Sequence, residues 1–253
     1  MNVCVLLKQT FDTEEKIILE EGRISEDDVK FVINPYDEYA VEQAIQIRDG
    51  QGGKVTVVSI GPERSAEALR SALAMGADEA VLISDERIGA DEYAVAQVLH
   101  AFASRESFDL YLGGNFSVDN GSGQVAIRLA ALLEIPHVSS ITKLELKDGQ
   151  ATVHRDAEGD LEVAEVTLPA LFTAQQGLNE PRYPSLQGIM KAKKKPFRQL
   201  TLDDIGLTPV EGRTERVDLF LPPARQAGKT IKGEPAAAAR ELVQLLRSEA
   251  KVI

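Results

Sequence analysis

Short apolar runs alternate with amphipathic stretches through the first half of the chain. The runs that predict buried strands are 3–7, 54–60, 79–83 and 109–113. Apolar residues at helical spacing predict helices over 38–48, 66–75, 93–104 and 124–133. Strands that alternate with helices through short loops indicate an α/β fold with a doubly wound, mostly parallel sheet covered on both faces.

The pattern changes after Pro136. Two runs, 142–146 and 151–155, flank the turn sequence Lys147-Asp148-Gly149-Gln150 and predict a hairpin. Further strands are expected over 161–167 and 170–174, so the sheet should end in antiparallel additions.

The C-terminal part of the chain differs from the rest in composition. Residues 197–234 are rich in proline, glycine and charge, and an amphipathic helix is expected over 235–251. We therefore expect an α/β domain over 1–196 and a C-terminal extension over 197–253 that lies across another surface.

Composition narrows the class of protein. The 253 residues carry a formal charge of −12, from 40 acidic and 28 basic side chains, which argues against a general nucleic-acid binder. The single cysteine, Cys4, lies in an apolar run and is expected to be buried, and no disulfide within the chain is possible. No run approaches the roughly 20 apolar residues of a membrane span, and no signal peptide is evident. We expect a cytoplasmic protein that does not insert into membranes.

A glycine-rich polar loop, 113–124, joins a predicted strand to a predicted helix. Ligands of open α/β sheets bind at the carboxyl ends of strands, where helix N-termini offer free N–H groups to anions. Ser122 could donate to a phosphate, and Asp119 could accept from a ribose hydroxyl or from the loop's own backbone. The loop is neither a dinucleotide fingerprint nor a Walker loop. A glycine-rich turn with Ser122 as helix cap is the other interpretation, and spacing alone does not choose between them.

Asn34-Pro35-Tyr36-Asp37 also precedes a predicted helix. Asp37 could cap that helix or accept from an adenine amino group, and Tyr36 could stack on a ring; taken alone, the cap is favoured. No metal-ligand spacing or catalytic triad order is present among the three histidines and the single cysteine. The residues alone thus predict a phosphate site and no reaction.

The stretch LNEPRYPSLQGIMKAKKKP, 178–196, combines an apolar loop with four lysines. It resembles the signature loop of the electron-transfer flavoprotein β subunit. The resemblance covers essentially the whole chain and includes VCVLLKQ, INPYDEYAVEQA, VTVVSIGP, RSALAMGADEAV, SVDNGSGQ and HRDAEGDLEVAEVTLPALFTAQQ, in order and at the family's spacing. NPYDEYAVEQA is most similar to the bacterial, β-oxidation-linked branch.

The resemblance implies an adenine-nucleotide α-hydrolase-like fold and one half of an αβ heterodimer. The α subunit would hold the redox-active FAD, the β subunit would hold AMP structurally, and the extension 197–253 would wrap the α subunit. The dimer would take electrons from acyl-CoA and related dehydrogenases and pass them to a membrane quinone oxidoreductase. The β subunit would be an electron-carrier subunit without a reaction of its own, which fits the lack of catalytic residues.

The resemblance also implies site residues. Those expected at the nucleotide are Leu6, Asn34, Pro35, Tyr36, Asp37, Ile60, Asn115, Phe116, Ser117, Val118, Asp119, Asn120, Gly121, Ser122, Gly123, Gln124, Val125 and Ala126. Tyr36 is also expected near the flavin of the α subunit. Those expected at the dehydrogenase are the anchor Leu186, with Arg182, Tyr183, Ile189, Met190, Lys191 and Lys194.

The loop departs from the animal-type pattern after Asp119, where small residues replace an acidic stretch and leave room for a diphosphate. DNGSGQV is somewhat similar to the loop of bifurcating relatives, which bind a second FAD in place of AMP. AMP is the first expectation and a second FAD the alternative. An adenine-nucleotide hydrolase or stress-type protein on a similar sheet has less support, because no Walker lysine or catalytic base follows the loop.

Overall fold

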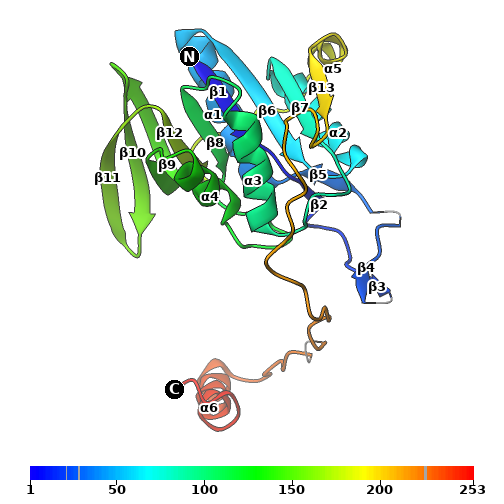
Figure 1. Cartoon of the computed structure of the whole chain (residues 1–253). Helices are drawn as coiled ribbons and strands as arrows, with labels where there is room; N and C mark the ends of the chain where they lie inside the picture. Colours follow the sequence, from blue (N-terminus) through cyan, green and yellow to red (C-terminus); the bar gives the residue numbers. More distant parts are fainter. Residues whose placement is uncertain (21, 28, 225–226) are drawn as a thin grey trace.

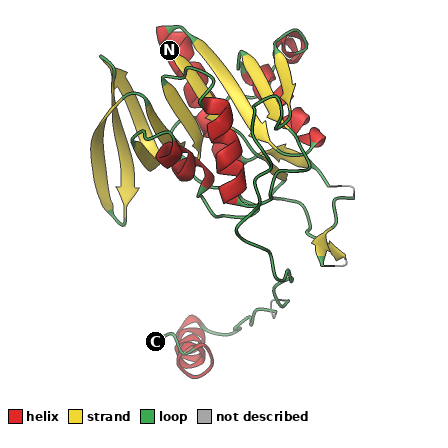
Figure 2. Ribbon diagram, viewed as in Figure 1, coloured by secondary structure: helices red, strands yellow, loops and turns green. Residues whose placement is uncertain are grey.

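A computed structural model describes residues 1–20, 22–27, 29–224 and 227–253 (Figures 1 and 2). Its centre is a nine-stranded sheet with the order β11-β10-β9-β12-β8-β1-β6-β7-β13. The parallel strands are β1 (Asn2–Leu6), β6 (Lys54–Ile60), β7 (Glu79–Ile83), β8 (Leu110–Gly114), β12 (Ala170–Ala174) and β13 (Phe197–Leu200). The expected doubly wound, mostly parallel sheet is confirmed.

Two hydrophobic cores cover the two faces of this sheet. Helices α1 (Pro35–Gln51) and α2 (Ala66–Met75) pack on one face, and α3 (Glu92–Ala103) and α4 (Val125–Leu132) pack on the other. The strands alternate between the cores, so Val5 faces α1 while Cys4 and Leu6 face α3 and α4. Cys4 is buried as expected, and burial raises the pKa of its thiol.

The antiparallel additions are β9 (His137–Lys147), β10 (Gln150–Ala157) and β11 (Asp160–Thr167). Strand β9 begins five residues before the predicted hairpin strand, because His137 and Val138 pair in parallel with β12 before the strand continues as a hairpin arm. These three strands project beyond the helices at one edge of the sheet (Figure 1).

Two small two-stranded sheets between β1 and α1 were not predicted. Strand β2 (Gln9–Phe11) pairs with β5 (Phe31–Ile33), and β3 (Leu19–Glu20) pairs with β4 (Arg23–Ile24). These strands have two or three residues, too few for a periodic pattern to identify.

The segment after residue 185 is more regular than expected. The predicted loop contains a short helix, α5 (Leu186–Ala192), whose N-cap Ser185 accepts from the Gly188 N–H at 3.0 Å. Residues 197–205, expected in the extension, contribute β13 to the edge of the main sheet and bury Leu202 and Ile205 in the second core. The irregular extension therefore begins after these residues.

The expected C-terminal helix is confirmed as α6 (Pro235–Leu245), followed by a π-helical turn (Leu246–Ala250). None of its residues is buried, and it lies away from the sheet at the end of a long irregular segment (Figure 1). No helix in the described part of the chain has the length and apolar character needed to cross a membrane.

Candidate functional site

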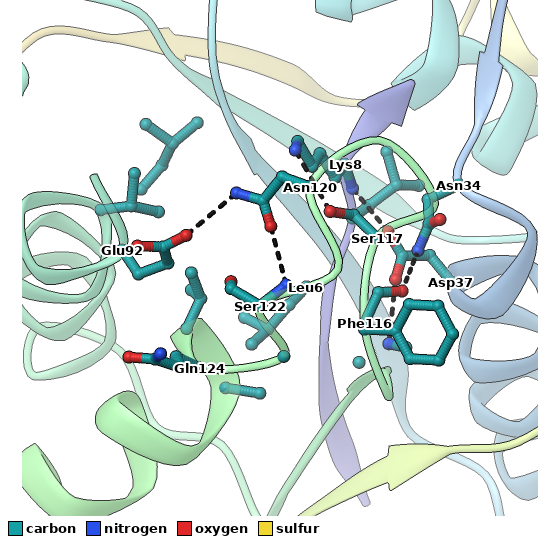
Figure 3. Close-up of a pocket in the computed structure, with 18 of the residues that line it drawn as sticks. Leu6, Lys8, Asn34, Asp37, Glu92, Phe116, Ser117, Asn120, Ser122 and Gln124 are labelled. Carbon is teal, nitrogen blue, oxygen red and sulfur yellow. Dashed lines mark hydrogen bonds between the residues drawn. The ribbon is translucent and has the colours of Figure 1, made fainter. Parts of the chain in front are cut away.

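A cavity of about 190 Å³ lies at the carboxyl ends of β1, β6 and β8, between the N-terminal ends of α3 and α4 (Figure 3). Its lining is Leu6, Leu7, Lys8, Asn34, Asp37, Val58, Ile60, Ala90, Asp91, Glu92, Val95, Leu99, Gly113, Gly114, Asn115, Phe116, Ser117, Asn120, Ser122, Gly123, Gln124, Val125 and Ala126. This is the sheet end at which α/β proteins bind ligands.

Asp37 ties together the strands that form the floor of the cavity. Its Oδ2 accepts from the Lys8 N–H at 2.7 Å, and its Oδ1 accepts from the Gly114 N–H at 2.9 Å. Asp37 is therefore not the helix cap, which corrects that interpretation; the N-cap position belongs to Asn34. Each carboxylate oxygen of Asp37 accepts one backbone N–H, and its expected role toward adenine stays a prediction. Burial raises the pKa of Asp37 to about 7, against the opposing effect of these N–H groups.

Asn34 holds the glycine-rich loop over the start of α1. Its Nδ2 donates to the Phe116 carbonyl at 2.9 Å, and its Oδ1 accepts from the Val118 N–H at 3.1 Å. The ring of Tyr36 packs on that of Phe116, with centroids 4.3 Å apart. Tyr36 thus supports the loop from behind and does not line the cavity.

Lys8 holds the same loop from the end of β1. Its Nζ pairs with Asp119 Oδ1 at 2.7 Å. The same Nζ donates to Ser117 Oγ at 3.3 Å, and Figure 3 shows these two residues side by side. Burial raises the pKa of Asp119, but the bonds from Lys8 and Ser117 outweigh it and leave that pKa below its usual value. The Asp119 carboxylate thus pairs with a lysine of the protein, a partner that was not expected. It also accepts from its own backbone N–H, as one of the two interpretations had it, and the ribose role stays a prediction.

The opposite wall comes from α3. Glu92 Oε1 accepts from Asn120 Nδ2 at 2.9 Å, and Asn120 Oδ1 in turn accepts from the Ser122 N–H at 2.9 Å (Figure 3). The pKa of Glu92 is lowered by its own backbone N–H and by hydrogen bonds from Ser122 and Asn120. Glu92 is therefore ionised at neutral pH.

Helix α4 begins at the cavity. Its N-cap is Gln124 and not Ser122, so the expected cap is wrong. Val125 and Ala126, in the first turn, line the cavity with N–H groups that have no partner within the helix. Gly123 has φ +61°, and a Cβ there would lie 2.9 Å from the Asn115 carbonyl, so this position requires glycine.

Most of the predicted nucleotide residues line the cavity. The ones that do not are Pro35, Tyr36, Val118, Asp119 and Gly121. The residues that sequence reasoning missed include Lys8, directly after the first strand, and Asp91 and Glu92, at the start of a helix that follows a strand. Each of these residues follows the end of a parallel strand, and this position in the sequence could have identified them as lining residues.

Asp91 connects the cavity wall to the C-terminal segment. As N-cap of α3 it accepts from the Ala94 N–H at 2.9 Å, and its other oxygen accepts from the N–H groups of Arg213 at 2.6 Å and Thr214 at 2.9 Å. Burial raises the pKa of Asp91, but these hydrogen bonds outweigh burial and leave the pKa below its usual value.

The second candidate region is the segment 178–196 around α5. Its apolar side chains point outward: Leu186 is 82% exposed, Tyr183 94% and Met190 68%. A leucine packed inward, the ordinary interpretation of Leu186, is excluded by this exposure. Ile189 is 47% exposed and completes an apolar surface on a protein that buries most others.

The charged residues of this segment fall into two groups: some bond to the α/β domain and others are exposed to solvent. Arg182 donates from Nε and Nη2 to the buried carboxylate of Glu42 in α1, at 2.7 and 2.9 Å, and so fastens the segment to the domain. Lys191 and Lys194 are exposed. Lys195 instead donates to the carbonyls of Leu73, at 2.9 Å, and Ala77, at 2.5 Å. Three of the four lysines, Lys191, Lys193 and Lys194, thus hold their charges at the exposed surface.

The described residues contain no group of three or more histidine, cysteine or acidic side chains that could hold a metal ion.

The comparisons with known proteins agree with this geometry. The family profile described as "Electron transfer flavoprotein domain" matches residues 22–205. The chain is 56% identical to the electron transfer flavoprotein subunit beta of Bacillus subtilis (strain 168) over the whole of both chains. It is 42% identical to the protein of the same name from Syntrophomonas wolfei, over all of this chain and 98% of the relative. It is 38% identical to the caffeyl-CoA reductase-Etf complex subunit CarD of Acetobacterium woodii, over 92% of each. The chain belongs to the electron transfer flavoprotein family as a β subunit, the partner of an α subunit in an electron carrier.

Proposed function

We propose that this β subunit binds AMP in the cavity at the carboxyl ends of β1, β6 and β8, where the nucleotide stabilises the fold and takes no part in redox chemistry. The observation that carries the proposal is the first turn of α4, whose free N–H groups lie at a cavity that the glycine-rich loop also lines. A phosphate is the group that such a helix start favours. Apolar side chains at strand ends, Leu6 and Ile60, offer a surface for a base.

A second FAD is the alternative occupant. The relative CarD is named as a subunit of a caffeyl-CoA reductase–Etf complex, so a related chain serves a different assembly. Against a dinucleotide stands the size of the cavity, about 190 Å³. Typical ligand pockets measure roughly 300–1,000 Å³, so the cavity of this chain is small, and of the two ligands the monophosphate requires less additional space.

The heterodimer would accept electrons from acyl-CoA and related dehydrogenases and deliver them to a membrane quinone oxidoreductase. The α subunit would hold the FAD that carries them, and this chain would supply no acid, base or nucleophile. The exposed apolar face of α5 supports dehydrogenase docking, with Leu186 as the anchor and nearby lysines as steering charges.

The extension beyond β13 would wrap the α subunit. Helix α6 buries none of its residues in this chain, although it carries apolar side chains such as Leu242 and Val243. An amphipathic helix of this length gains its stability from packing on another surface. The α subunit supplies a surface of that kind.

The test is to purify the heterodimer with its own α subunit and identify the nucleotides that heat releases, by mass spectrometry. One FAD and one AMP per heterodimer are expected. Two FAD would establish the alternative, and no adenine nucleotide beyond the FAD of the α subunit would overturn the site. A hydrolase would be indicated instead by ATP turnover in the same preparation.

Electron transfer is tested separately on the same heterodimer. Reduction of its flavin by an acyl-CoA dehydrogenase with substrate, followed by reoxidation by a quinone oxidoreductase, is expected. A heterodimer that no acyl-CoA dehydrogenase reduces would contradict the proposed partners while leaving the nucleotide assignment intact.

A further inference from the structure

The cavity contains an unusual charge for a phosphate site. Glu92, the first residue of α3, places a carboxylate in its wall, directed toward Asn120 of the loop (Figure 3). A carboxylate beside a bound phosphate repels it, and the repulsion is strong inside a protein. The position of Glu92 therefore affects which anions the cavity accepts.

The charges around Glu92 do not offset it. Lys8 is the one lysine or arginine in the described lining, and its Nζ is paired with Asp119. The carboxylate of Asp91 already accepts three backbone N–H groups. A first phosphate can use the free N–H groups of α4, but a second one has no cation of the lining left to pair with.

Glu92 is also fixed in position. Asn120 donates to it and at the same time accepts from the Ser122 N–H, so this amide joins α3 to the loop just before Gly123. The Ser122 N–H, one of the donors that a glycine-rich loop would offer to phosphate, is thereby occupied within the protein. The carboxylate and the occupied donor both stand on the side of the loop that faces α3.

We propose that Glu92 is a specificity-determining residue that limits the cavity to a single phosphate group, so that the site takes a nucleoside monophosphate and rejects a neighbouring second phosphate. This inference rests on the proposed nucleotide function. It assigns to Glu92 the selection between AMP and ligands with a pyrophosphate, such as ADP or FAD.

The test is Glu92→Gln in the full heterodimer. Glutamine keeps one oxygen that can accept from Asn120 and removes the charge, while its second oxygen is replaced by an NH2 group of similar size. Glu86→Gln is the matched control, because Glu86 is exposed, lies six residues earlier and is outside the cavity lining. Each heterodimer is equilibrated with equal concentrations of AMP and ADP and desalted, and the bound nucleotides are quantified by mass spectrometry.

The bound ratio of ADP to AMP is expected to rise at least about tenfold in Glu92→Gln and to stay at the wild-type value in Glu86→Gln. An unchanged ratio in Glu92→Gln would overturn the inference. Loss of AMP without any gain of ADP would also overturn it, since that result would make Glu92 a ribose ligand. Wild-type protein that binds neither nucleotide would refute the proposed function itself, a separate outcome.

Discussion

The nucleotide cavity and the α5 segment use hydrogen bonds in opposite ways. Around the cavity, Asp37, Asn34, Lys8 and Asn120 bond to the backbone and side chains of the loop, so its shape is set before any ligand arrives. On α5 the side chains expected to meet a partner, above all Leu186, are apolar and exposed, so hydrogen bonds do not fix them in place. A preorganised site suits a ligand that stays bound, and an exposed apolar surface suits partners that exchange.

The largest effect is expected from removing the bridge at the floor of the cavity. Asp37→Ala leaves the buried N–H groups of Lys8 and Gly114 without an acceptor, at a cost of roughly 3 kcal/mol of unfolding free energy. Chemical denaturation of the heterodimer measures the loss, and released AMP should fall with it. Stability and AMP content equal to wild type would show that the cavity is not organised by Asp37.

The same residue gives a pH dependence with a definite sign. Burial raises the pKa of Asp37 to about 7, so its contribution to stability is fully present below the unfolded pKa of about 4 and is lost as pH rises towards 7. The stability difference between wild type and Asp37→Asn should therefore shrink between pH 4 and pH 7. Denaturation curves across that range check it, and a difference that grows with pH would contradict it.

Leu186→Ala tests the other side of the comparison. Loss of an anchor should raise the KM for the dehydrogenase roughly 30-fold, corresponding to about 2 kcal/mol, with flavin content and stability unchanged. Leu161→Ala is the matched control, because Leu161 is 59% exposed on β11, a strand at the opposite edge of the sheet from α5. Equal KM values for the two variants would remove the anchor role of Leu186.

The smallest effect is expected from two glycines of the glycine-rich loop, which differ in the space around them. Gly121 and Gly123 both have positive φ, but a Cβ at Gly121 meets nothing within 4 Å, whereas one at Gly123 meets the Asn115 carbonyl at 2.9 Å. Both alanine variants lose about 1 kcal/mol to backbone strain. Only Gly123→Ala should also weaken AMP retention, measured as nucleotide per heterodimer. Equal retention would mean that loop shape does not control binding.

Sequence patterns predicted the parallel sheet well, since buried strands and helices repeat over many residues, and they placed the glycine-rich loop at a strand end; the resemblance supplied other lining residues, such as Leu6 and Ile60. They failed where the outcome depends on one contact. Asp37 was read as a cap because caps are local, but its carboxylate is taken by N–H groups from two distant strands. Strand β13 has only four residues and lies in a segment rich in charge, so no periodic pattern identifies it. Its pairing with β7 joins residues that are far apart in the sequence, which a local pattern does not predict. The resemblance, not periodicity, identified Leu186.

Helix α6 affects how susceptible the β subunit is to proteolysis before it binds the α subunit. Eleven residues are marginal as an isolated helix in water, and none of these is buried. A β chain synthesised without its α subunit would expose Leu242 and Val243 in the part of the tail that follows the contacts of Arg213 and Thr214 with Asp91, in reach of proteases. We expect the tail to be cleaved first in the orphan subunit and protected in the heterodimer. Degradation would then limit the amount of β subunit to the amount of α subunit available to protect it.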